Sequence, residues 1–387
     1  MAMNSIEVTL LITSSVLVVP VTLIALMNLL VWPRRLNKSA VEKGQVSVLI
    51  PARNEMDNLE SCVEYALAQG SPVKEILIYD DGSTDRTLDV IDRLLRVHHG
   101  TVRQVPTVSL PAGWVGKSHA CKRLAEHALS PWLLFIDADT RLQPDAVRSL
   151  VAEAKHRNAT LLSAWPKIEM NSFTERFLMP LLNFIVFSIF PAFISSFIRN
   201  SASLGLAHGA CILAYRETYE RIEGHELVKD RLFEDTALAR EWRKRSENSQ
   251  VIDGRKVAIV RMYENFDGIW NGFSKNYYPA LGSLWSFTVF QMYMVVTFVA
   301  LPLIVLILFF YDAIGPVFML LAAWPLAPRT LVALRFRHPL WSVVLHPIAV
   351  TFMVVLGMRS WWQSSIGGGV RWKGRTYMAS GIVVNDD

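Results

Sequence analysis

Charged residues are scarce in this chain, and cysteine is scarcer still. Asp, Glu, Lys and Arg make up only 19% of the 387 residues while 52% are hydrophobic, which is too apolar for an ordinary soluble domain. The three cysteines, Cys62, Cys121 and Cys211, form an odd, sparse set without zinc-type spacing to histidine. They argue against a disulfide framework and indicate a reducing compartment.

The excess of basic over acidic residues is also small. The net charge is +5, from 39 Lys and Arg against 34 Asp and Glu. We therefore expect no nucleic-acid partner, and we interpret the excess as basic loops beside the anionic head groups of a membrane bilayer. The sequence contains no internal repeat and no low-complexity tract.

Long apolar runs are abundant instead, and the first lies at the N-terminus. Residues 6–32 carry a single charge, Glu7, at their edge. About 20 helical residues cross about 30 Å of hydrocarbon, so we expect residues 1–36 to form a transmembrane anchor, with Pro20 as a possible kink. A cleavable signal peptide is the alternative, but it needs a basic start and a small-residue cleavage site. This run begins uncharged and ends in Trp32-Pro33, so the anchor is favoured.

The residues after the anchor indicate its orientation. Arg34, Arg35 and Lys38 follow the apolar run. Because positive residues accumulate on the cytoplasmic side of a membrane, we expect a multi-pass protein of the cell membrane whose main domain is cytoplasmic.

Residues 45–283 have a different pattern. Short apolar runs at 46–50, 76–79 and 132–136 are typical of buried strands, and two further segments, 59–67 and 87–97, have helical spacing. This alternation predicts an α/β fold, a mostly parallel sheet with helices on both faces. Such folds bind ligands outside the carboxyl ends of their strands.

One almost uncharged run interrupts this domain at about residues 177–199. A membrane crossing here would place the two halves of the α/β domain on opposite sides of the bilayer. We therefore expect interfacial or re-entrant helices broken at Pro180 and Pro191. A pair of buried core helices is the alternative.

Residues 284–360 are apolar again and are expected to form a C-terminal helical membrane region. The runs 287–311, 314–334 and 340–358 can each span, although prolines interrupt the last two. Three spans would leave the basic tail, residues 361–387, outside the cell, against the positive-inside bias. If the third run lies in the membrane interface the tail is cytoplasmic, and we favour that arrangement.

Polar clusters follow each of the three expected strands. They are Pro51, Arg53 and Glu55 after the first, Asp80 and Asp81 after the second, and Asp137, Ala138 and Asp139 after the third. One acidic strand end is often only a solvated loop or a helix cap. Three of them at the ends of parallel strands converge on one crevice, so we expect a binding site there.

The third cluster has the pattern of a metal site. Asp137 and Asp139 are separated by one residue, so in an extended segment their side chains point the same way. Two carboxylates suit Mg²⁺ or Mn²⁺, with diphosphate oxygens completing the octahedron. The alternative is that Asp139 and Thr140 cap a helix near Pro144.

Two further features fit a nucleotide. Asp80 and Asp81 can accept hydrogen bonds from a uracil ring or a ribose, and Gly82 allows the backbone to turn sharply. Lys117 follows Gly113-x-x-Gly116 and can reach a phosphate as a point charge. The segment lacks the full P-loop pattern, so it does not indicate an ATPase.

An acid pair, Glu234 and Asp235, begins an expected helix. Such a pair is often mere capping, but beside these clusters Asp235 is our candidate general base, with Glu234 as helper or alternative. We expect three nearby residues, His208, Gly209 and Trp242, to bind the acceptor.

The order of these motifs resembles a known family. Residues 48–55 (VLIPARNE), 80–85 (DDGSTD), 137–139 (DAD) and 234–235 (ED) are similar to the inverting family 2 glycosyltransferases of the GT-A (Rossmann-like) fold, over about residues 45–280. A closer resemblance is to bacterial membrane enzymes of hopanoid and carotenoid glycosylation. It is carried by residues 113–117, 208–210, 234–235, 270–276 and 370–375.

The resemblance implies roles for individual residues. Asp81 contacts the nucleotide, Asp139 holds the metal and Asp235 is the base. Processive synthases of the family carry Gln/Arg-x-x-Arg-Trp downstream of the base, where this chain has residues 272–276 (GFSKN). This departure favours a single transfer. Arg371 and Trp372 resemble the end of that motif, past the membrane segments, and we expect them to bind acceptor.

The implied activity is inverting transfer of a sugar from a nucleotide-diphosphate sugar, with a UDP-sugar favoured. The acceptor is a hydroxyl or carboxyl group of a lipid-like molecule such as a carotenoid or a hopanoid, and the cofactor is Mg²⁺ or Mn²⁺. The expected donor residues are Pro51, Arg53, Glu55, Asp80, Asp81, Lys117, Asp137 and Ala138. A polyprenyl-phosphate sugar transferase, a processive polysaccharide synthase and a non-catalytic nucleotide-binding scaffold are alternatives.

Overall fold

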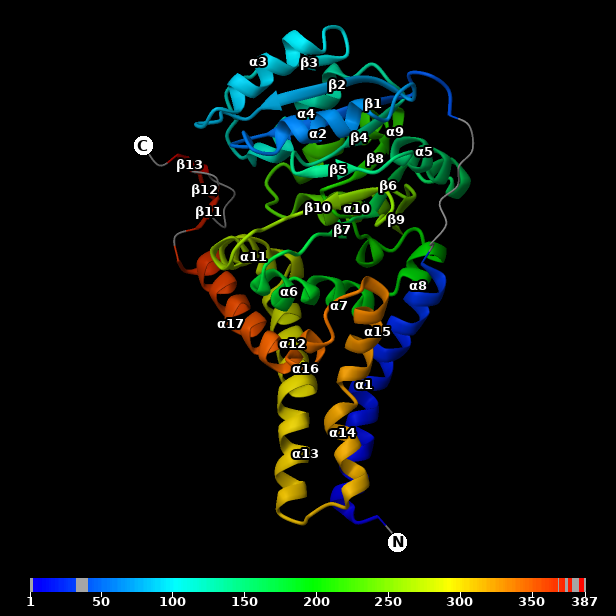
Figure 1. Ribbon diagram of the computed structural model, residues 1–387, viewed down its shortest axis with the longest axis vertical. Helices are drawn as coiled ribbons and strands as arrows, with labels where there is room; N and C mark the ends of the chain where they lie inside the picture. Colours follow the sequence, from blue (N-terminus) through cyan, green and yellow to red (C-terminus); the bar gives the residue numbers. More distant parts are fainter. Residues whose placement is uncertain (1–2, 33–40, 368, 373–374, 378–382, 386–387) are drawn as a thin grey trace. The chain divides into compact units, whose positions relative to one another are not determined.

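The computed structural model of the protein describes residues 3–32, 41–367, 369–372, 375–377 and 383–385. The chain forms two compact units (Figure 1). The α/β unit comprises Pro33–Glu169, Ile194–Met262 and Gly369–Asp387, and the apolar helical unit comprises Met1–Trp32, Met170–Phe193 and Tyr263–Gly368. Each unit is built from three separate stretches of chain.

A seven-stranded sheet organises the α/β unit. Its order is β3-β2-β1-β4-β8-β6-β9, and β8 runs antiparallel to both of its neighbours while the other neighbouring pairs are parallel. The strands are β1 (Val46–Ala52), β2 (Val73–Asp80), β3 (Val102–Gln104), β4 (Trp132–Phe135), β6 (Leu161–Trp165), β8 (Ile212–Tyr215) and β9 (Ser249–Asp253). A smaller sheet joins β5 (Thr140–Leu142), β10 (Ala258–Val260) and β7 (Lys167–Ile168).

Helices cover both faces of the large sheet. Alternate residues of a strand point to opposite faces, and in β1 Val48 and Ile50 belong to one buried cluster while Leu49 belongs to the other. The first cluster includes α2 (Leu59–Leu67), α3 (Thr87–Val97) and α5 (Ala146–Arg157); the second includes α4 (Gly116–His127), α9 (Arg216–Arg221) and α10 (Glu234–Lys244). The prediction of a mixed, mostly parallel sheet between two helical layers is confirmed, and α2 and α3 have the expected bounds.

In the described part of the apolar helical unit, two helices are long and apolar enough to cross a membrane. They are α1 (Ser5–Val31), with Pro20 inside it, and the continuous helix Leu284–Phe310, which comprises α12 (Leu284–Val295), the π-turn η3 (Val296–Ala300) and α13 (Leu301–Phe310). The segment Pro316–Ala323 and α15 (Leu326–Phe336) are bent by 48° at the break between them. They are a third candidate span if the two are counted together as one bent span. The run expected at 340–358 lies in α16 (Trp341–Val344) and α17 (His346–Ser365), which are not among these candidates.

The apolar run near 177–199 forms three short helices. They are α6 (Phe173–Leu178), α7 (Pro180–Ile189) and α8 (Ala192–Phe197), with breaks next to Pro180 and Pro191. At about 1.5 Å per residue none of them can cross a bilayer, so the two parts of the large sheet stay on one side. Their location in the membrane interface stays a prediction.

The unit boundaries differ from those expected from the sequence. Residues 170–193 and 263–283, which we placed in the α/β domain, group with the apolar helices, the second stretch as α11 (Phe266–Leu281). Residues 361–368 of the expected tail also group with the apolar helices. Residues 369–387 group with the α/β unit, where β11 (Val370–Trp372), β12 (Arg375–Tyr377) and β13 (Val383–Asn385) form an antiparallel sheet. Local hydropathy marks apolar segments, but it does not reveal which core a segment joins.

Candidate active site

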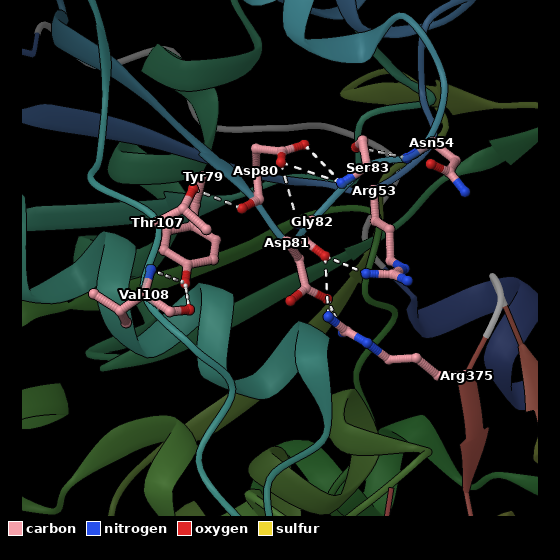
Figure 2. Close-up of polar contacts among 10 residues, drawn as sticks. All are labelled: Arg53, Asn54, Tyr79, Asp80, Asp81, Gly82, Ser83, Thr107, Val108 and Arg375. Atoms are coloured by element: carbon pink, nitrogen blue, oxygen red, sulfur yellow. Dashed lines mark hydrogen bonds and ion pairs between the residues drawn. The ribbon is translucent and has the colours of Figure 1, made fainter. Parts of the chain in front are cut away.

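Two loops at the carboxyl ends of β1 and β2 are joined by hydrogen bonds. The Asn54 N–H donates to Ser83 Oγ at 2.9 Å, and the Thr84 N–H donates to Asn54 Oδ1 at 2.7 Å. Arg53 donates from Nη1 to the carbonyl oxygen of Asp81 (Figure 2). Asn54 has a φ of +52°, in the left-handed region that Asn tolerates better than most residues. The first two predicted clusters therefore lie together.

Asp80 shapes the loop that follows β2. Its Oδ2 accepts hydrogen bonds from the backbone N–H groups of Gly82 at 3.1 Å and Ser83 at 3.2 Å. Gly82 has a φ of +70°, which favours glycine. The Asp80 carbonyl accepts from Thr107 Oγ1 at 2.9 Å. The Asp80 carboxylate thus holds its own loop and presents the next residue, Asp81.

Asp81 lies against the first residue of α4 and against the C-terminal tail. Its Oδ2 is 2.5 Å from Nη1 of Arg375 on β12 (Figure 2). Gly116 leaves the space that both side chains occupy, because a Cβ at this position would collide with Asp81 Oδ2 and Arg375 Nη1. Glycine at 116 is therefore required for this close approach.

Lys117, the next residue of α4, connects the other two acidic pairs. Its Nζ is 2.7 Å from Asp137 Oδ1 and 2.8 Å from Glu234 Oε1. Burial lowers the pKa of Lys117, but the two carboxylates raise it by more, so its pKa stands well above the ordinary value. The ammonium stays charged and holds the ends of β4 and α10 together.

Asp235 is presented by two backbone groups. Its Oδ2 accepts from the Gly209 N–H at 2.8 Å and its Oδ1 from the Thr236 N–H at 2.6 Å. Burial raises its pKa to about 7, with a further contribution from the adjacent Glu234 carboxylate, while Lys117 opposes the shift. At neutral pH this carboxyl group is therefore poised between its two protonation states, as a general base requires.

The Asp137–Asp139 pair has the chemistry of a divalent-cation site. Both acids are partly exposed and Ala138 between them is buried, so the carboxylates share the accessible side. The alternative that Asp139 caps a helix is wrong, because α5 begins at Ala146, beyond β5, with Asp145 at its N-cap. No group of three or more His, Cys, Asp or Glu side chains suited to a metal occurs in the described part of the chain. A pair of carboxylates still fits Mg²⁺ or Mn²⁺ that shares substrate phosphates.

The remaining candidate donor residues have mainly local contacts. Pro51 lies within β1, in register with Tyr79 of β2. Glu55 is held at the start of α2, where its N–H donates to Thr87 Oγ1 at 2.8 Å and its Oε2 accepts from Asn58 Nδ2 at 2.9 Å. Both residues support the loop that carries Arg53.

His208 and Gly209 form the turn that supports Asp235. The His208 Nδ1 accepts from the Ala210 N–H at 3.2 Å, and burial lowers the pKa of the ring to about 4. The imidazole is therefore neutral at pH 7. A Cβ at Gly209 would stand 2.8 Å from Lys117 Nζ, so a larger residue here would displace the lysine from its present position. The assignment of His208 and Gly209 to acceptor binding stays a prediction.

Trp242 requires a correction. Its side chain is completely buried in the core under the sheet, and its Nε1–H donates to Thr160 Oγ1 at 2.9 Å. A side chain without exposed surface cannot meet an acceptor, so we now assign Trp242 a packing role. The side chains of Arg371 and Trp372, also expected to bind acceptor, lie outside the described residues.

Arg375 and Gly116 are the site residues that sequence reasoning did not assign. Arg375 belongs to the basic tail, 294 positions from its partner Asp81, and no local pattern links two such distant residues. A signal was present for Gly116, since Gly113 and Gly116 flank Lys117, but a glycine pair by itself is usually a turn.

The fold and the acidic pairs gathered around one lysine define a glycosyltransferase of the GT-A type. In agreement, the solved structure of mannosyltransferase PcManGT from Pyrobaculum calidifontis, in complex with GDP-Man and Mn²⁺, matches with a TM-score of 0.55 over 92% of this chain and 96% of that chain, at 15% identity. More particularly, residues 47–221 match the model of Glycosyl transferase family 2.

Relatives extend the similarity beyond this domain. The 4,4'-diaponeurosporenoate glycosyltransferase of Staphylococcus aureus strain USA300 is 27% identical over 395 residues, which cover 95% of this chain and 98% of the relative. The corresponding protein of strain MRSA252 is 26% identical over 389 residues, with the same coverage. The similarity therefore extends over most of the apolar helical unit as well.

Proposed function

We propose that this glycosyltransferase moves a sugar from a nucleotide-diphosphate sugar, a UDP-sugar by preference, to a hydroxyl or carboxyl group of a long apolar acceptor, with inversion at the anomeric carbon. The observation that carries this proposal is the position of Lys117. It joins Asp137, of the candidate metal pair, to Glu234, the neighbour of the candidate base. The residues that we propose to bind donor and to activate acceptor thus lie around one ammonium group.

On the donor side, the joined loops after β1 and β2 would hold the nucleoside. Asp81 offers carboxylate oxygens to a ribose or a base, and Arg53 buttresses its backbone. Lys117 would bind the diphosphate as a charged donor. Its two carboxylate partners keep it ionised and in place before the donor arrives.

Asp137 and Asp139 would hold a divalent cation. When bound, the ion stabilises the negative charge that develops on the departing diphosphate. The mannosyltransferase with the similar fold was solved with Mn²⁺, which supports the proposal of a divalent cation in this chain.

On the acceptor side, Asp235 would remove the proton. With a pKa of about 7 it is more basic than a free carboxylic acid, whose pKa is about 4. It can therefore deprotonate an acceptor carboxyl group and can assist deprotonation of a hydroxyl in the transition state. A single attack on the face opposite the diphosphate produces inversion.

The acceptor is proposed to be a carotenoid-type acid or a similar membrane lipid. The Staphylococcus aureus relative is named for a carboxylate, diaponeurosporenoate, and its similarity covers nearly the whole chain. The apolar helical unit supplies helices able to cross a bilayer. An acceptor dissolved in the bilayer can reach the active site of an enzyme only if the enzyme lies at the membrane, and such helices would hold it there.

The tail supports a specific topology. Asp81 precedes Leu284–Phe310 and the bent pair, and Arg375 follows them, yet the two residues are in contact. The chain must therefore cross the membrane an even number of times between them. We propose that these two segments cross, that α17 does not, and that α/β unit and tail share the cytoplasm, where nucleotide-sugars are made.

The test is transfer by the purified full chain in lipid nanodiscs with Mn²⁺ or Mg²⁺. UDP-, GDP- and dTDP-sugars are offered with a carotenoid carboxylic acid, a hydroxylated carotenoid, a hopanoid alcohol and a polyprenyl phosphate. We expect one glycosylated apolar product, detected by mass spectrometry, whose anomeric configuration is opposite to that of the donor. Asp139→Asn should abolish the reaction and the metal dependence of donor binding.

Other outcomes would contradict the proposal in different ways. An acid-labile phosphodiester product would identify a polyprenyl-phosphate sugar transferase. A ladder of lengthening products would identify a processive synthase. Donor binding without any transfer would identify a scaffold, and retention of configuration would exclude the single displacement assigned to Asp235.

A further inference from the structure

The C-terminal hairpin, β11 and β12, places one guanidinium inside the candidate donor site. Arg375 Nη1 is 2.5 Å from Asp81 Oδ2, and Arg375 Nη2 donates to the Asp81 carbonyl oxygen at 3.2 Å. Arg53 Nη1 donates to the same carbonyl oxygen. Figure 2 shows the two guanidinium groups reaching Asp81 from opposite ends of the chain. The tail is therefore part of the site's polar network.

The hairpin holds Arg375 firmly. In the antiparallel register Trp372 lies opposite Arg375 and Val370 opposite Tyr377, and β13 pairs with the other edge of β12. Arg375 and Tyr377 lie on the same face of the strand, and only 2% of Tyr377 is exposed. The Arg375 side chain itself is 11% exposed. This degree of burial is unusual for a surface tail.

The position of Arg375 at the start of α4 suits a residue that binds a phosphate group. Its Nη1 occupies the space left by Gly116 at the start of α4, and the next residue is Lys117. The N-terminal turn of α4, a helix of 12 residues, directs free N–H groups and the positive end of the helix dipole to the same place. The Arg375 guanidinium thus lies at the start of α4, one residue before Lys117.

The pairing of charges implies an exchange when donor binds. Arg375 is paired with Asp81, the residue proposed to hold the nucleoside. If Asp81 turns its oxygens to the nucleoside, the largely buried guanidinium needs a new anionic partner, because an unpaired buried charge is costly. The diphosphate is the anion that arrives with the nucleoside, and a guanidinium matches phosphate oxygens in a bidentate manner.

We propose that Arg375 is a donor-binding residue that exchanges the Asp81 carboxylate for the diphosphate of the nucleotide-sugar, so that the C-terminal hairpin completes the donor site. This inference rests on the proposed function. It adds that the C-terminal tail binds the diphosphate leaving group. It also predicts that the tail discriminates a nucleoside diphosphate from the nucleoside alone.

The test is calorimetric titration of the detergent-purified full chain with UDP, GDP and dTDP in the presence of Mn²⁺, and competition by the matching nucleoside. Arg375→Gln should raise the Kd of the best-binding diphosphate roughly 10- to 100-fold, the range expected for lost hydrogen bonds to a charged group. The affinity for the nucleoside should change less than twofold. Arg375→Lys should lie between wild type and Arg375→Gln, because it keeps the charge but loses the bidentate geometry.

Arg245→Gln is the matched control. Arg245 forms a partly exposed ion pair with Glu241 on α10, so the control removes one positive charge without touching the site, and its Kd should equal that of the wild type. Thermal melting of each variant near the wild-type Tm shows that the fold is kept.

Three results would overturn the inference. Arg375→Gln that binds the diphosphate as well as or better than wild type would mean that Arg375 only covers Asp81. Equal weakening for nucleoside and diphosphate would mean that it acts only by orienting Asp81. Wild-type protein that binds none of the diphosphates would overturn the proposed function as well, whereas the first two results leave that function intact.

Discussion

The two units of this protein treat apolar side chains in opposite ways. In the α/β unit Leu49 and Ile50 are completely buried between helical layers. In the apolar helical unit Leu30 is 71% exposed and Phe310 is 78% exposed. Exposed apolar surface on this scale marks contact with a membrane or a partner. The apolar helical unit thus offers a surface of this kind.

The units also use polar side chains differently. In the α/β unit, charged side chains gather at strand ends around Lys117. In the apolar helical unit, a buried polar side chain donates hydrogen bonds to backbone carbonyls at the end of a helix. Asn28 of α1 donates to the carbonyls of Phe187 at 3.0 Å and Phe190 at 2.7 Å, where α7 ends. In hydrocarbon an unsatisfied carbonyl is costly, so this asparagine is structural. In the α/β unit the polar side chains thus form the candidate active site. In the apolar helical unit Asn28 stabilises the packing of helices.

The largest expected effect isolates the chemistry of the α/β unit. Asp235→Asn should lower turnover by roughly 10²–10⁴-fold, the usual contribution of a general base, because the amide cannot accept the proton. Binding of nucleoside diphosphate should persist. Single-turnover kinetics with calorimetry measure both quantities. Asp230, an exposed acid in the preceding loop, provides the control, and Asp230→Asn should leave turnover unchanged. Near wild-type turnover in Asp235→Asn would exclude Asp235 as the base.

The next effect concerns stability inside the α/β unit. Arg243 is 1% exposed, and it donates to the carbonyls of Ser195 at 3.0 Å, Ile198 at 2.8 Å and Ser249 at 2.7 Å. Arg243→Met leaves these acceptors unsatisfied and should cost about 3 kcal/mol or more. Hydrogen exchange in peptides 194–199 and 249–253 measures the loss.

Arg245, two positions further along α10, provides the comparison for this variant. Its side chain is 37% exposed and pairs with Glu241 on the surface. Arg245→Met should therefore change the opening free energy of the same peptides by less than about 1 kcal/mol. Similar losses in both variants would show that burial of Arg243 is not what stabilises this region.

A third prediction compares one exposed apolar residue in each of the two units. Ile304 in α13 is 46% exposed and Val97 in α3 is 66% exposed. Ile304→Lys should impair membrane insertion by about 2.5–3.5 kcal/mol, whereas Val97→Lys should stay within about 0.5 kcal/mol of wild-type stability. Alkaline extraction of membranes and melting of the purified proteins measure these effects. Normal insertion of Ile304→Lys would argue that Leu284–Phe310 does not span.

The smallest expected effect is the pH dependence of transfer. The base must be deprotonated, and burial raises the pKa of Asp235 to about 7. The rate should therefore level off above pH 8 and fall about tenfold for each unit below pH 7, the slope for a single proton. Values of kcat/KM measured from pH 5 to 9 at a saturating concentration of the cation test this prediction. A profile flat down to pH 5 would mean that Asp235 keeps an ordinary acidic pKa.

Much of the fold could be predicted from the sequence because its signals are local. The bounds of α2 and α3 follow from helical spacing, and the acidic clusters follow from strand ends that a parallel sheet brings together. Trp242 shows the limit of this reasoning. The sequence indicates a helix beginning at Glu234, but only packing reveals that the indole points into the core.

The sequence by itself determined the two kinds of region, the order of the motifs and the two long apolar helices, since each depends on residues close together along the chain. Tertiary structure alone decided that residues 170–193 join the apolar helices, that Lys117 links Asp137 to Glu234, and that Arg375 meets Asp81. The reason is physical. Hydropathy and spacing act over a few residues, whereas ion pairs and pKa shifts depend on distance and burial in space, which only the folded chain sets.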